Sequence, residues 1–241
     1  MNSATPAVSL FIPCFIDQFF PQVGDAVVQI LARLGVPIHY PEEQTCCGQF
    51  ALTVGDTGTA RRLARHFIRV FSAEGAIICP SASCTLTVRR DYPALAGSPE
   101  AVYQVKSVTS RVFELSEWLA AQGPLPWRAR LEGVLALHRS CKARELGVVE
   151  NAAALLSQVE GLTVTTVSPY YTCCGFGGVF TAQHPELAWA IGQSYLEAVA
   201  ATGATGLISL DASCFLHLQG VAESMGLNLD FYHLAEVLAG E

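Results

Sequence analysis

Residues 45–50 read TCCGQF, and residues 172–177 read TCCGFG. Cys14 precedes the first of these cysteine pairs by the same distance as Cys141 precedes the second, so that all three cysteines of each set correspond at an offset of 127 residues. A fixed spacing between similar motifs is the signature of an internal repeat. The sequence therefore predicts that the chain is a duplication, and that one unit built twice decides its fold.

Two further landmarks extend the repeat through each half. Cys84 corresponds to Cys214 at an offset of 130 residues. The stretch VFELSEWLA at 112–120 also resembles FYHLAEVLA at 231–239, near the end of each half. Four landmarks in the same order are difficult to attribute to chance, and they indicate that the duplication covers nearly the whole chain.

The join between the halves is predicted at AAQGPLPW, residues 120–127, because two prolines and a glycine are typical of a linker. We therefore expect two domains, residues 1–123 and residues 124–241. In both, short β-branched runs alternate with longer helical patterns. This alternation predicts parallel βαβ units with right-handed crossovers, and hence two similar α/β halves related by pseudo-twofold symmetry.

The expected elements place Cys14 at the end of a strand and the other cysteines of the repeat after a strand. In the first half we expect strands at 7–14, 36–41 and 76–80 and helices at 23–35 and 57–75. In the second half we expect strands at 134–138, 162–169 and 205–211 and helices at 148–161 and 185–203. The carboxyl ends of parallel strands share one edge of a sheet, where open α/β folds form ligand sites. Four thiols should therefore converge in each half, namely Cys14, Cys46, Cys47 and Cys84 in the first and Cys141, Cys173, Cys174 and Cys214 in the second.

The composition narrows the classes of function. Of the 241 residues, 51% are apolar, 15% are charged, and the formal net charge is −7. With so few cations no basic surface for nucleic acid is expected. We find no secretory leader and no apolar run of the ~18 residues that a membrane span needs, and we expect a soluble cytoplasmic protein. Nine cysteines in a reducing compartment favour metal binding or redox chemistry over disulfides.

Three chemistries can explain an adjacent cysteine pair followed by glycine, a residue that allows positive φ. A vicinal disulfide would strain the backbone and leave the other cysteines of each set unexplained. Zinc accepts four thiolates, but zinc sites commonly contain a C-x2-C knuckle, which this chain lacks. Iron–sulfur clusters take cysteine thiolates and need a dry pocket with N–H donors. An iron–sulfur site is therefore favoured, with zinc as the alternative.

The motifs PEEQTCCGQFA, PSASC, HRSCKARELGV and CCGFGGVFTAQHPE are long and specific. Together with the duplication they resemble the cysteine-rich CCG family, which includes the B subunit of heterodisulfide reductase and the iron–sulfur subunits of glycolate oxidase and anaerobic glycerol-3-phosphate dehydrogenase. The last two carry ferredoxin-type C-x2-C-x2-C runs, which do not occur here. The resemblance is greatest to the lactate-utilisation A branch of the family.

This resemblance implies two cysteine-ligated iron–sulfur clusters of the [4Fe–4S] kind, with the exact cluster type left open. It implies electron transfer during the oxidation of L-lactate to pyruvate, in a complex with the B and C proteins of the same system, and no catalysis by this chain alone. Three alternatives stay open. They are a heterodisulfide or thiol-disulfide reductase subunit whose cluster is the reaction site, a subunit of another 2-hydroxy acid oxidase such as that for glycolate, and a zinc-stabilised interaction module.

The sequence departs from the five-cysteine pattern of heterodisulfide reductase at one position in each half. Ser81 and Asp211 stand where that family member has a further cysteine, and both are possible additional ligands. Cys79 lies two residues before the family position, inside an expected strand, and is left out of the ligand set. His138, three residues before Cys141, is either a donor near the second set or an ordinary strand-end histidine.

Overall fold

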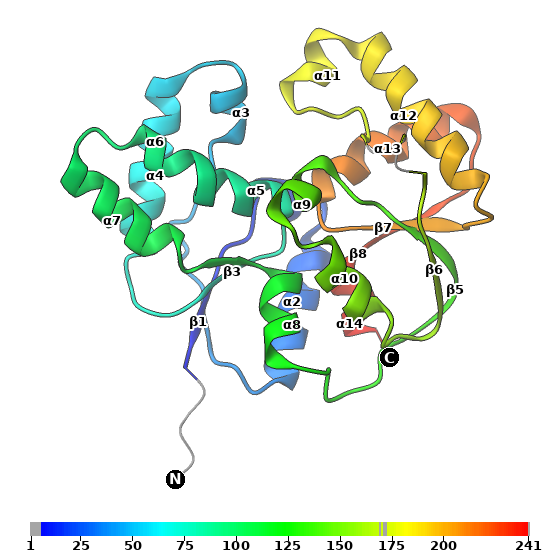
Figure 1. Ribbon diagram of the computed structural model, residues 1–241, viewed down its shortest axis with the longest axis horizontal. Coiled ribbons are helices and arrows are strands. Elements are labelled where there is room, and N and C mark those ends of the chain that lie inside the picture. Colours follow the sequence, from blue (N-terminus) through cyan, green and yellow to red (C-terminus); the bar gives the residue numbers. More distant parts are fainter. Residues whose placement is uncertain (1–5, 169, 171–172, 241) are drawn as a thin grey trace. The chain divides into compact units, whose positions relative to one another are not determined.

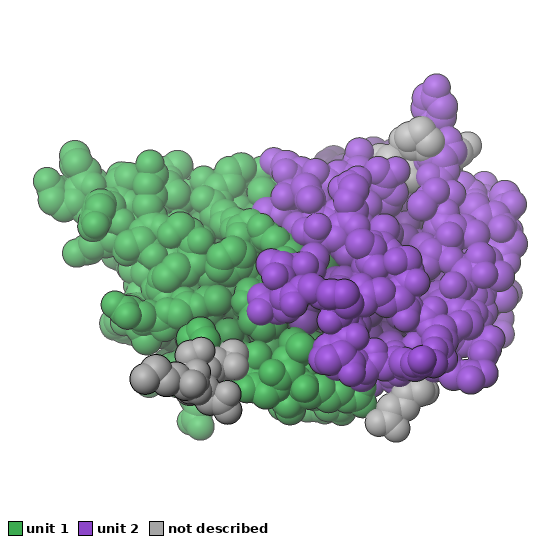
Figure 2. Space-filling model, turned by 60° about the horizontal axis from the view of Figure 1, so that its bottom comes forward, with its two compact units in different colours: residues 1–118 green, residues 119–241 purple. Residues whose placement is uncertain are grey.

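The computed structural model describes residues 6–168, 170 and 173–240. The chain divides into two compact units, residues 1–118 and 119–241, coloured green and purple in Figure 2. The division lies inside helix α8 (Leu115–Gln122), close to the segment in which the sequence places the join. The boundary between residues 123 and 124 stays a prediction.

Each unit is built on a four-stranded sheet in which all neighbouring strands run parallel. The first sheet has the order β2-β1-β3-β4 and the second has the matching order β6-β5-β7-β8. The strands of the first are β1 (Val8–Leu10), β2 (Ile38–His39), β3 (Ile77–Cys79) and β4 (Val112–Glu114), and those of the second are β5 (Arg130–Leu137), β6 (Glu160–Thr165), β7 (Gly206–Ser209) and β8 (Asp230–His233). The predicted class, two similar parallel α/β halves, is confirmed.

Helices connect these strands, and Figure 1 marks with the same labels those for which it has room. Those of the first unit are α1 (Cys14–Phe19), α2 (Pro21–Arg33), α3 (Gln49–Thr53), α4 (Thr57–Val70), α5 (Ala82–Leu86), the π-helical turn η1 (Thr87–Asp91), α6 (Tyr92–Leu95) and α7 (Pro99–Thr109), followed by α8 at the division. Those of the second are α9 (Cys141–Leu146), α10 (Val149–Leu156), α11 (Val179–Gln183), α12 (Pro185–Ala200), α13 (Ala212–Met225) and α14 (Leu234–Ala239). None of the helices within the described ranges has the length and apolar character needed to cross a membrane.

The central strands hold each unit together because successive side chains, which point to opposite faces, are buried. In the second unit Ala136 of β5 and Leu207 of β7 are partners in register, and both pack into a core with Leu196 of α12 and Leu218 of α13. In the same unit, helix α10 contacts β6 and helix α14 contacts β5. Full burial of one leucine side chain contributes about 1.5–3 kcal/mol, so these cores are the main stabilising term.

The strand order also explains why the loops that carry cysteines meet. Strand β1 lies between β2 and β3, and β5 lies between β6 and β7, so consecutive connections leave the central strand toward opposite neighbours. This reversal is the switch point at which open parallel sheets bind ligands, beyond the carboxyl ends of the strands. Both sheets therefore present one such edge.

The structure adds elements that the sequence patterns did not predict. Three strands were expected in each half and four are found, because β4 and β8 begin the two landmark stretches at 112–120 and 231–239 and turn at once into helices. Helices α2, α4, α10 and α12 correspond to the four expected helices, whereas the following elements were not predicted: α1, α3, α5, α6, α7, α8, α9, α11, α13, α14 and the turn η1. Of the expected strand at 162–169, the part at 162–165 is formed, as the end of β6, and Pro169 lies outside the described residues, as does Thr172 of the second motif.

Candidate metal centres

The three loops that follow β1, β2 and β3 carry the first cysteine set. Cys14 is the first residue of α1, directly after β1. Cys46 and Cys47 precede Gly48, the residue before α3. Cys84 lies in the first turn of α5, after β3. The sheet topology thus brings together residues that are up to 70 positions apart in the sequence.

The four thiols of this first set form one connected cluster. The Sγ atoms of Cys47 and Cys84 are 3.3 Å apart. The thiols of Cys14 and Cys46 are hydrogen-bonded to each other, as are those of Cys46 and Cys47. The backbone N–H of Gly48 also donates to the Sγ of Cys46 at 3.3 Å. The predicted convergence of the four thiols is therefore seen in the structure, and all nine cysteines of the chain are free thiols.

The contacts inside the first set separate one thiolate from its neighbours. Hydrogen bonds from Cys14 and Cys47 lower the pKa of Cys46 to about 3, although its partial burial acts in the opposite direction. The contact with Cys46 raises the pKa of Cys14, and contacts with Cys46 and Cys84 raise the pKa of Cys47. Without metal, Cys14 and Cys47 therefore keep their protons. A cation that binds here must displace them.

The second set repeats this arrangement after β5, β6 and β7. Cys141 begins α9, Cys173 and Cys174 precede Gly175, and Cys214 lies in the first turn of α13. The Sγ atoms of Cys174 and Cys214 are 3.1 Å apart. The N–H of Gly175 donates to the Sγ of Cys173 and that of Phe176 to the Sγ of Cys174, both at 3.4 Å.

The second set differs from the first in its exposure and its charge. Cys141 and Cys173 are exposed, whereas the corresponding Cys14 and Cys46 are half-buried. The hydrogen bond with Cys174 raises the pKa of Cys173, and partial desolvation of its thiol raises the pKa of Cys141. All four thiols of this set have a raised pKa, in contrast to Cys46 of the first set. The second set is thus the more open of the two, and it holds its protons more firmly.

The glycine after each pair has the conformation that the sequence predicts. Gly48 has φ = 83° and Gly175 has φ = 91°, in the left-handed region that side chains with a Cβ disfavour. At Gly175 the space is also closed, since a Cβ would lie 2.3 Å from the carbonyl oxygen of Ala188 and 3.1 Å from the backbone nitrogen of Gly192. The glycine therefore lets the cysteine loop lie directly against α12.

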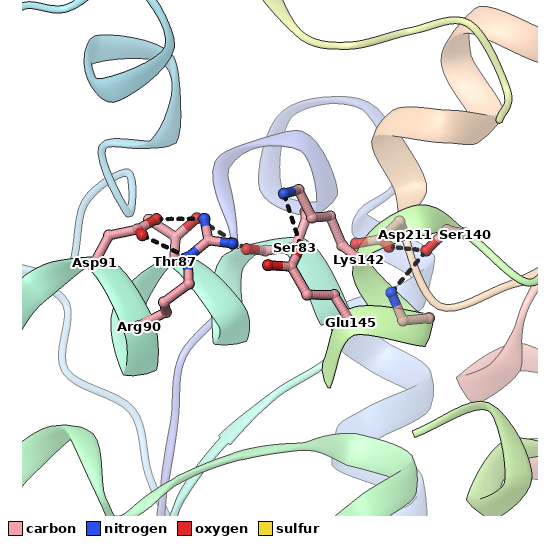
Figure 3. A network of polar contacts seen from close by, with 9 residues as sticks. Ser83, Thr87, Arg90, Asp91, Ser140, Lys142, Glu145 and Asp211 are labelled. Carbon is pink, nitrogen blue, oxygen red and sulfur yellow. Dashed lines mark hydrogen bonds and ion pairs between the residues drawn. The ribbon is translucent and has the colours of Figure 1, made fainter. Parts of the chain in front are cut away.

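Ser81 and Asp211, the possible additional ligands, already have hydrogen-bonding roles. The Ser81 hydroxyl accepts the backbone N–H of Cys84 at 3.3 Å and thereby caps α5. The Asp211 carboxylate accepts a hydrogen bond from Ser140 at 2.8 Å, and Ser140 in turn caps α9 by accepting the N–H of Ala143 (Figure 3). Both oxygen-bearing residues are buried next to a cysteine helix, and they orient the backbone that carries Cys84 and Cys141.

Cys79 and His138 lie nearer to the thiols than their sequence patterns indicate. Cys79 packs in the same buried cluster as Cys47 and Cys84, and its thiol donates to the carbonyl oxygen of Ser81 at 3.7 Å. His138 is 1% exposed, and one of its ring nitrogens lies within 4.8 Å of the Sγ atoms of Cys174 and Cys214. Burial lowers the pKa of His138 to about 4, so its imidazole is neutral at physiological pH.

The donor chemistry fits a thiophilic metal group. Each set offers four sulfur atoms, two of them buried, with backbone N–H groups directed at the sulfurs. Thiolate sulfur is the preferred ligand of iron–sulfur clusters and of structural zinc, whereas magnesium and calcium prefer oxygen. The residues present therefore suit a cysteine-bound metal in each unit.

Comparison with known proteins agrees with the sequence motifs and the fold. The family model described as "Cysteine-rich domain" (CCG) matches residues 8–89 and again 135–219. "Lactate utilization protein A 2" of Bacillus cereus is 36% identical over 235 residues, which cover 96% of this chain and 97% of that protein. "Lactate utilization protein A" of Bacillus cytotoxicus is 36% identical over 234 residues, which cover 96% and 98% of the two chains.

One solved structure shows the same fold over nearly all of the chain. A hypothetical protein from Helicobacter pylori superposes with a TM-score of 0.69 at 12% sequence identity. The match covers 99% of this chain and 51% of that protein, so the chain spans about half of its length. At this identity the likeness concerns the fold alone.

Proposed function

This chain belongs to the family of the cysteine-rich (CCG) domain, and from that premise we propose that it is an iron–sulfur electron-transfer subunit of a system that oxidises lactate to pyruvate. The observation that carries the proposal is the pair of four-thiol sets, each at the carboxyl edge of its own parallel sheet. The names of the relatives, which concern lactate utilisation, supply the substrate.

Each cysteine set would hold one cluster, and an iron–sulfur cluster when bound supplies one-electron redox chemistry. The chain's own residues bind and tune it. Cys47, Cys84, Cys174 and Cys214 supply the buried side of each site, where water is excluded. The N–H groups of the CCG loops donate to sulfur and stabilise its negative charge.

Electrons from lactate must reach and leave this chain through other proteins. We assign the removal of hydrogen from lactate to a partner, and we expect the B and C proteins of the same lactate-utilisation system to be the partners, in the cytoplasm. The exposed thiols Cys141 and Cys173 favour the second site as the one that exchanges electrons with a partner, because electron transfer requires close approach. The first site, in which two thiols are half-buried and two are buried, then relays electrons.

The test is the metal content of the full chain prepared without oxygen. Iron and acid-labile sulfide, together with a visible absorption band that bleaches on reduction and an EPR signal, are expected. A matched variant, Cys47→Ser with Cys174→Ser, should lack both iron and sulfide, since it removes a buried thiol from each set. Stoichiometric zinc, with no colour and no response to a reductant, would contradict the proposal and indicate a structural zinc site instead.

A further inference from the structure

The two halves place different aromatic pairs beside their buried thiols. The offset of 127 that aligns the cysteines sets His138 at the position of Phe11. Phe11 packs edge-on against Phe67 of α4, with ring centroids 5.0 Å apart and an interplanar angle of 83°. His138 packs in the same way against Tyr195 of α12, at 4.8 Å and 75°. A carbon-only pair in the first half is thus replaced by a hydrogen-bonding pair in the second.

His138 brings its imidazole ring beside the second thiol set, and one nitrogen of that ring is unsatisfied. Its Nδ1 is hydrogen-bonded to the hydroxyl of Tyr195 at 2.7 Å, whereas its buried Nε2 has no hydrogen-bond partner among the described residues. The histidine offers one ligand atom within 4.8 Å of the Sγ atoms of Cys174 and Cys214. A buried polar nitrogen without a partner is costly, by about 1–3 kcal/mol, which indicates that this one is completed by the group that the thiols hold.

The hydroxyl of Tyr195 determines which ring nitrogen carries the hydrogen. This side chain is 2% exposed, and Nδ1 of His138 is the acceptor that its hydroxyl reaches among the described residues. Because a buried hydroxyl hydrogen needs an acceptor, Tyr195 donates and Nδ1 accepts. A neutral imidazole has one N–H, so the hydrogen of His138 is on Nε2, the buried nitrogen that has no hydrogen-bond partner among the described residues.

We propose that His138 donates its Nε2–H to the sulfur of the group bound by the second cysteine set, and that this donor makes the second site easier to reduce than the first. The inference rests on the proposed function, since it requires a redox-active group in both sets. A hydrogen bond to sulfur stabilises negative charge and raises a cluster's reduction potential. Phe11 offers no such hydrogen bond to the first set. His138 thus acts as a positioning and tuning residue, held by Tyr195.

The experiment is a redox titration of the full chain, prepared without oxygen and followed by EPR. The variant His138→Phe introduces the residue type of Phe11 at this position, leaves Tyr195 in place and removes the donor. We expect two midpoint potentials in the natural chain and a shift of the higher one to a lower value in this variant, with the other unchanged. Tyr195→Phe should cause a smaller shift in the same direction. It removes the hydroxyl that holds the hydrogen of His138 on Nε2, but it does not remove the imidazole.

Two further variants keep the test decisive. His138→Gln retains an N–H donor and should preserve more of the higher potential than His138→Phe does, while Phe11→Leu, the control in the first half, should leave it unchanged. The inference would be overturned if His138→Phe had the same higher midpoint potential as the natural chain. It would also be overturned if His138→Gln and His138→Phe shifted that potential equally. A strong ¹⁴N hyperfine coupling that His138→Phe abolishes would overturn it as well, because it would show that the histidine is a ligand.

The outcome for the histidine is separate from the outcome for the function. Absence of iron and sulfide from the natural chain would refute the proposed function itself. Full loading of both sites with an unshifted potential in His138→Phe would refute only the role of the histidine. Loss of the second site's iron from every His138 variant alike would also refute it, because a hydrogen-bond donor is not required to retain a cluster held by four thiolates.

Discussion

The nine cysteines are chemically identical but lie in three different environments. Cys46 is half-buried and accepts hydrogen bonds from two thiols, which favours its thiolate. Cys173, its counterpart, is exposed, but the contact with Cys174 favours its protonated form. Cys79 is fully buried in β3, where loss of hydration raises the pKa of its thiol. Reactivity should therefore follow the neighbours of each thiol rather than its exposure alone.

Cys46 should be the thiol of the metal-free chain whose alkylation depends least on pH. Its pKa of about 3 means that it is a thiolate throughout the neutral range, so its rate with iodoacetamide should stay nearly constant between about pH 6 and pH 8. The rate of Cys173, whose pKa is raised, should increase about tenfold per pH unit over the same range. Quantitative mass spectrometry of the labelled peptides measures both rates. Parallel pH profiles for the two residues would contradict the assigned thiolate.

Whether Cys79 is a ligand can be tested by comparing its substitution with that of Cys47, a buried member of the first cysteine set. Cys79→Ala should retain the iron of both sites and lower the free energy of unfolding by roughly 1 kcal/mol, as expected for a small buried truncation. Cys47→Ala should lose the iron of the first site, because Cys47 lies 3.3 Å from Cys84 within the set. Iron analysis and chemical unfolding check these outcomes. Loss of iron in Cys79→Ala would instead make Cys79 a fifth ligand.

The repeat made the eight thiols predictable, but not the side chains around them. Spacing alone places Cys14 and Cys84 at the same sheet edge, because parallel strands leave no other arrangement. The alignment of Phe11 with His138 was available from the offset of 127, yet its meaning depends on Tyr195, which comes from a distant helix. Local patterns do not report which distant side chain supplies a hydrogen bond, and this is why His138 stayed ambiguous in the sequence.

At the level of elements, the predictions succeeded where a segment was long and periodic. Helices α4 and α12 were expected within a few residues of their observed bounds, because their apolar residues recur at helical spacing. Strand β4 was missed because it has three residues and continues directly into α8. Such a short strand is defined by its pairing with β3, which is a tertiary contact and leaves little local signal.

The glycines at helix and loop ends allow a matched test of the second cysteine loop. Gly175→Ala should be strongly destabilising, by roughly 3–4 kcal/mol, because a left-handed alanine and a clash with the carbonyl of Ala188 add together. Gly203→Ala has a similar φ of 75° but meets no atom within 4 Å, so it should cost only about 1–2 kcal/mol.

Denaturant unfolding of both variants, with iron analysis of the folded protein, gives the comparison. Gly175→Ala should also lose iron from the second site, because the displaced loop carries Cys173 and Cys174. Gly203→Ala should retain it. If the two variants were equally stable, the close approach of the loop to α12 would not be required for the fold.

At the level of the whole molecule, each unit has its own sheet, its own core and its own thiol set. Both sheets have the same strand order, and each core contains two of the thiols of its set. The duplication therefore repeats a complete set of four thiols rather than half of one. This organisation predicts two sites that load independently, since mutations without shared partners usually have additive effects.

Paired removals of the buried thiols test this independence and count the sites at the same time. Cys47→Ser with Cys84→Ser should remove roughly half of the iron and sulfide and leave the EPR signal of the second site intact. Cys174→Ser with Cys214→Ser should remove the other half and leave the signal of the first. If either double variant lost all of its iron, the two sets would contribute to one shared cluster, because only a shared group fails completely when one set is broken.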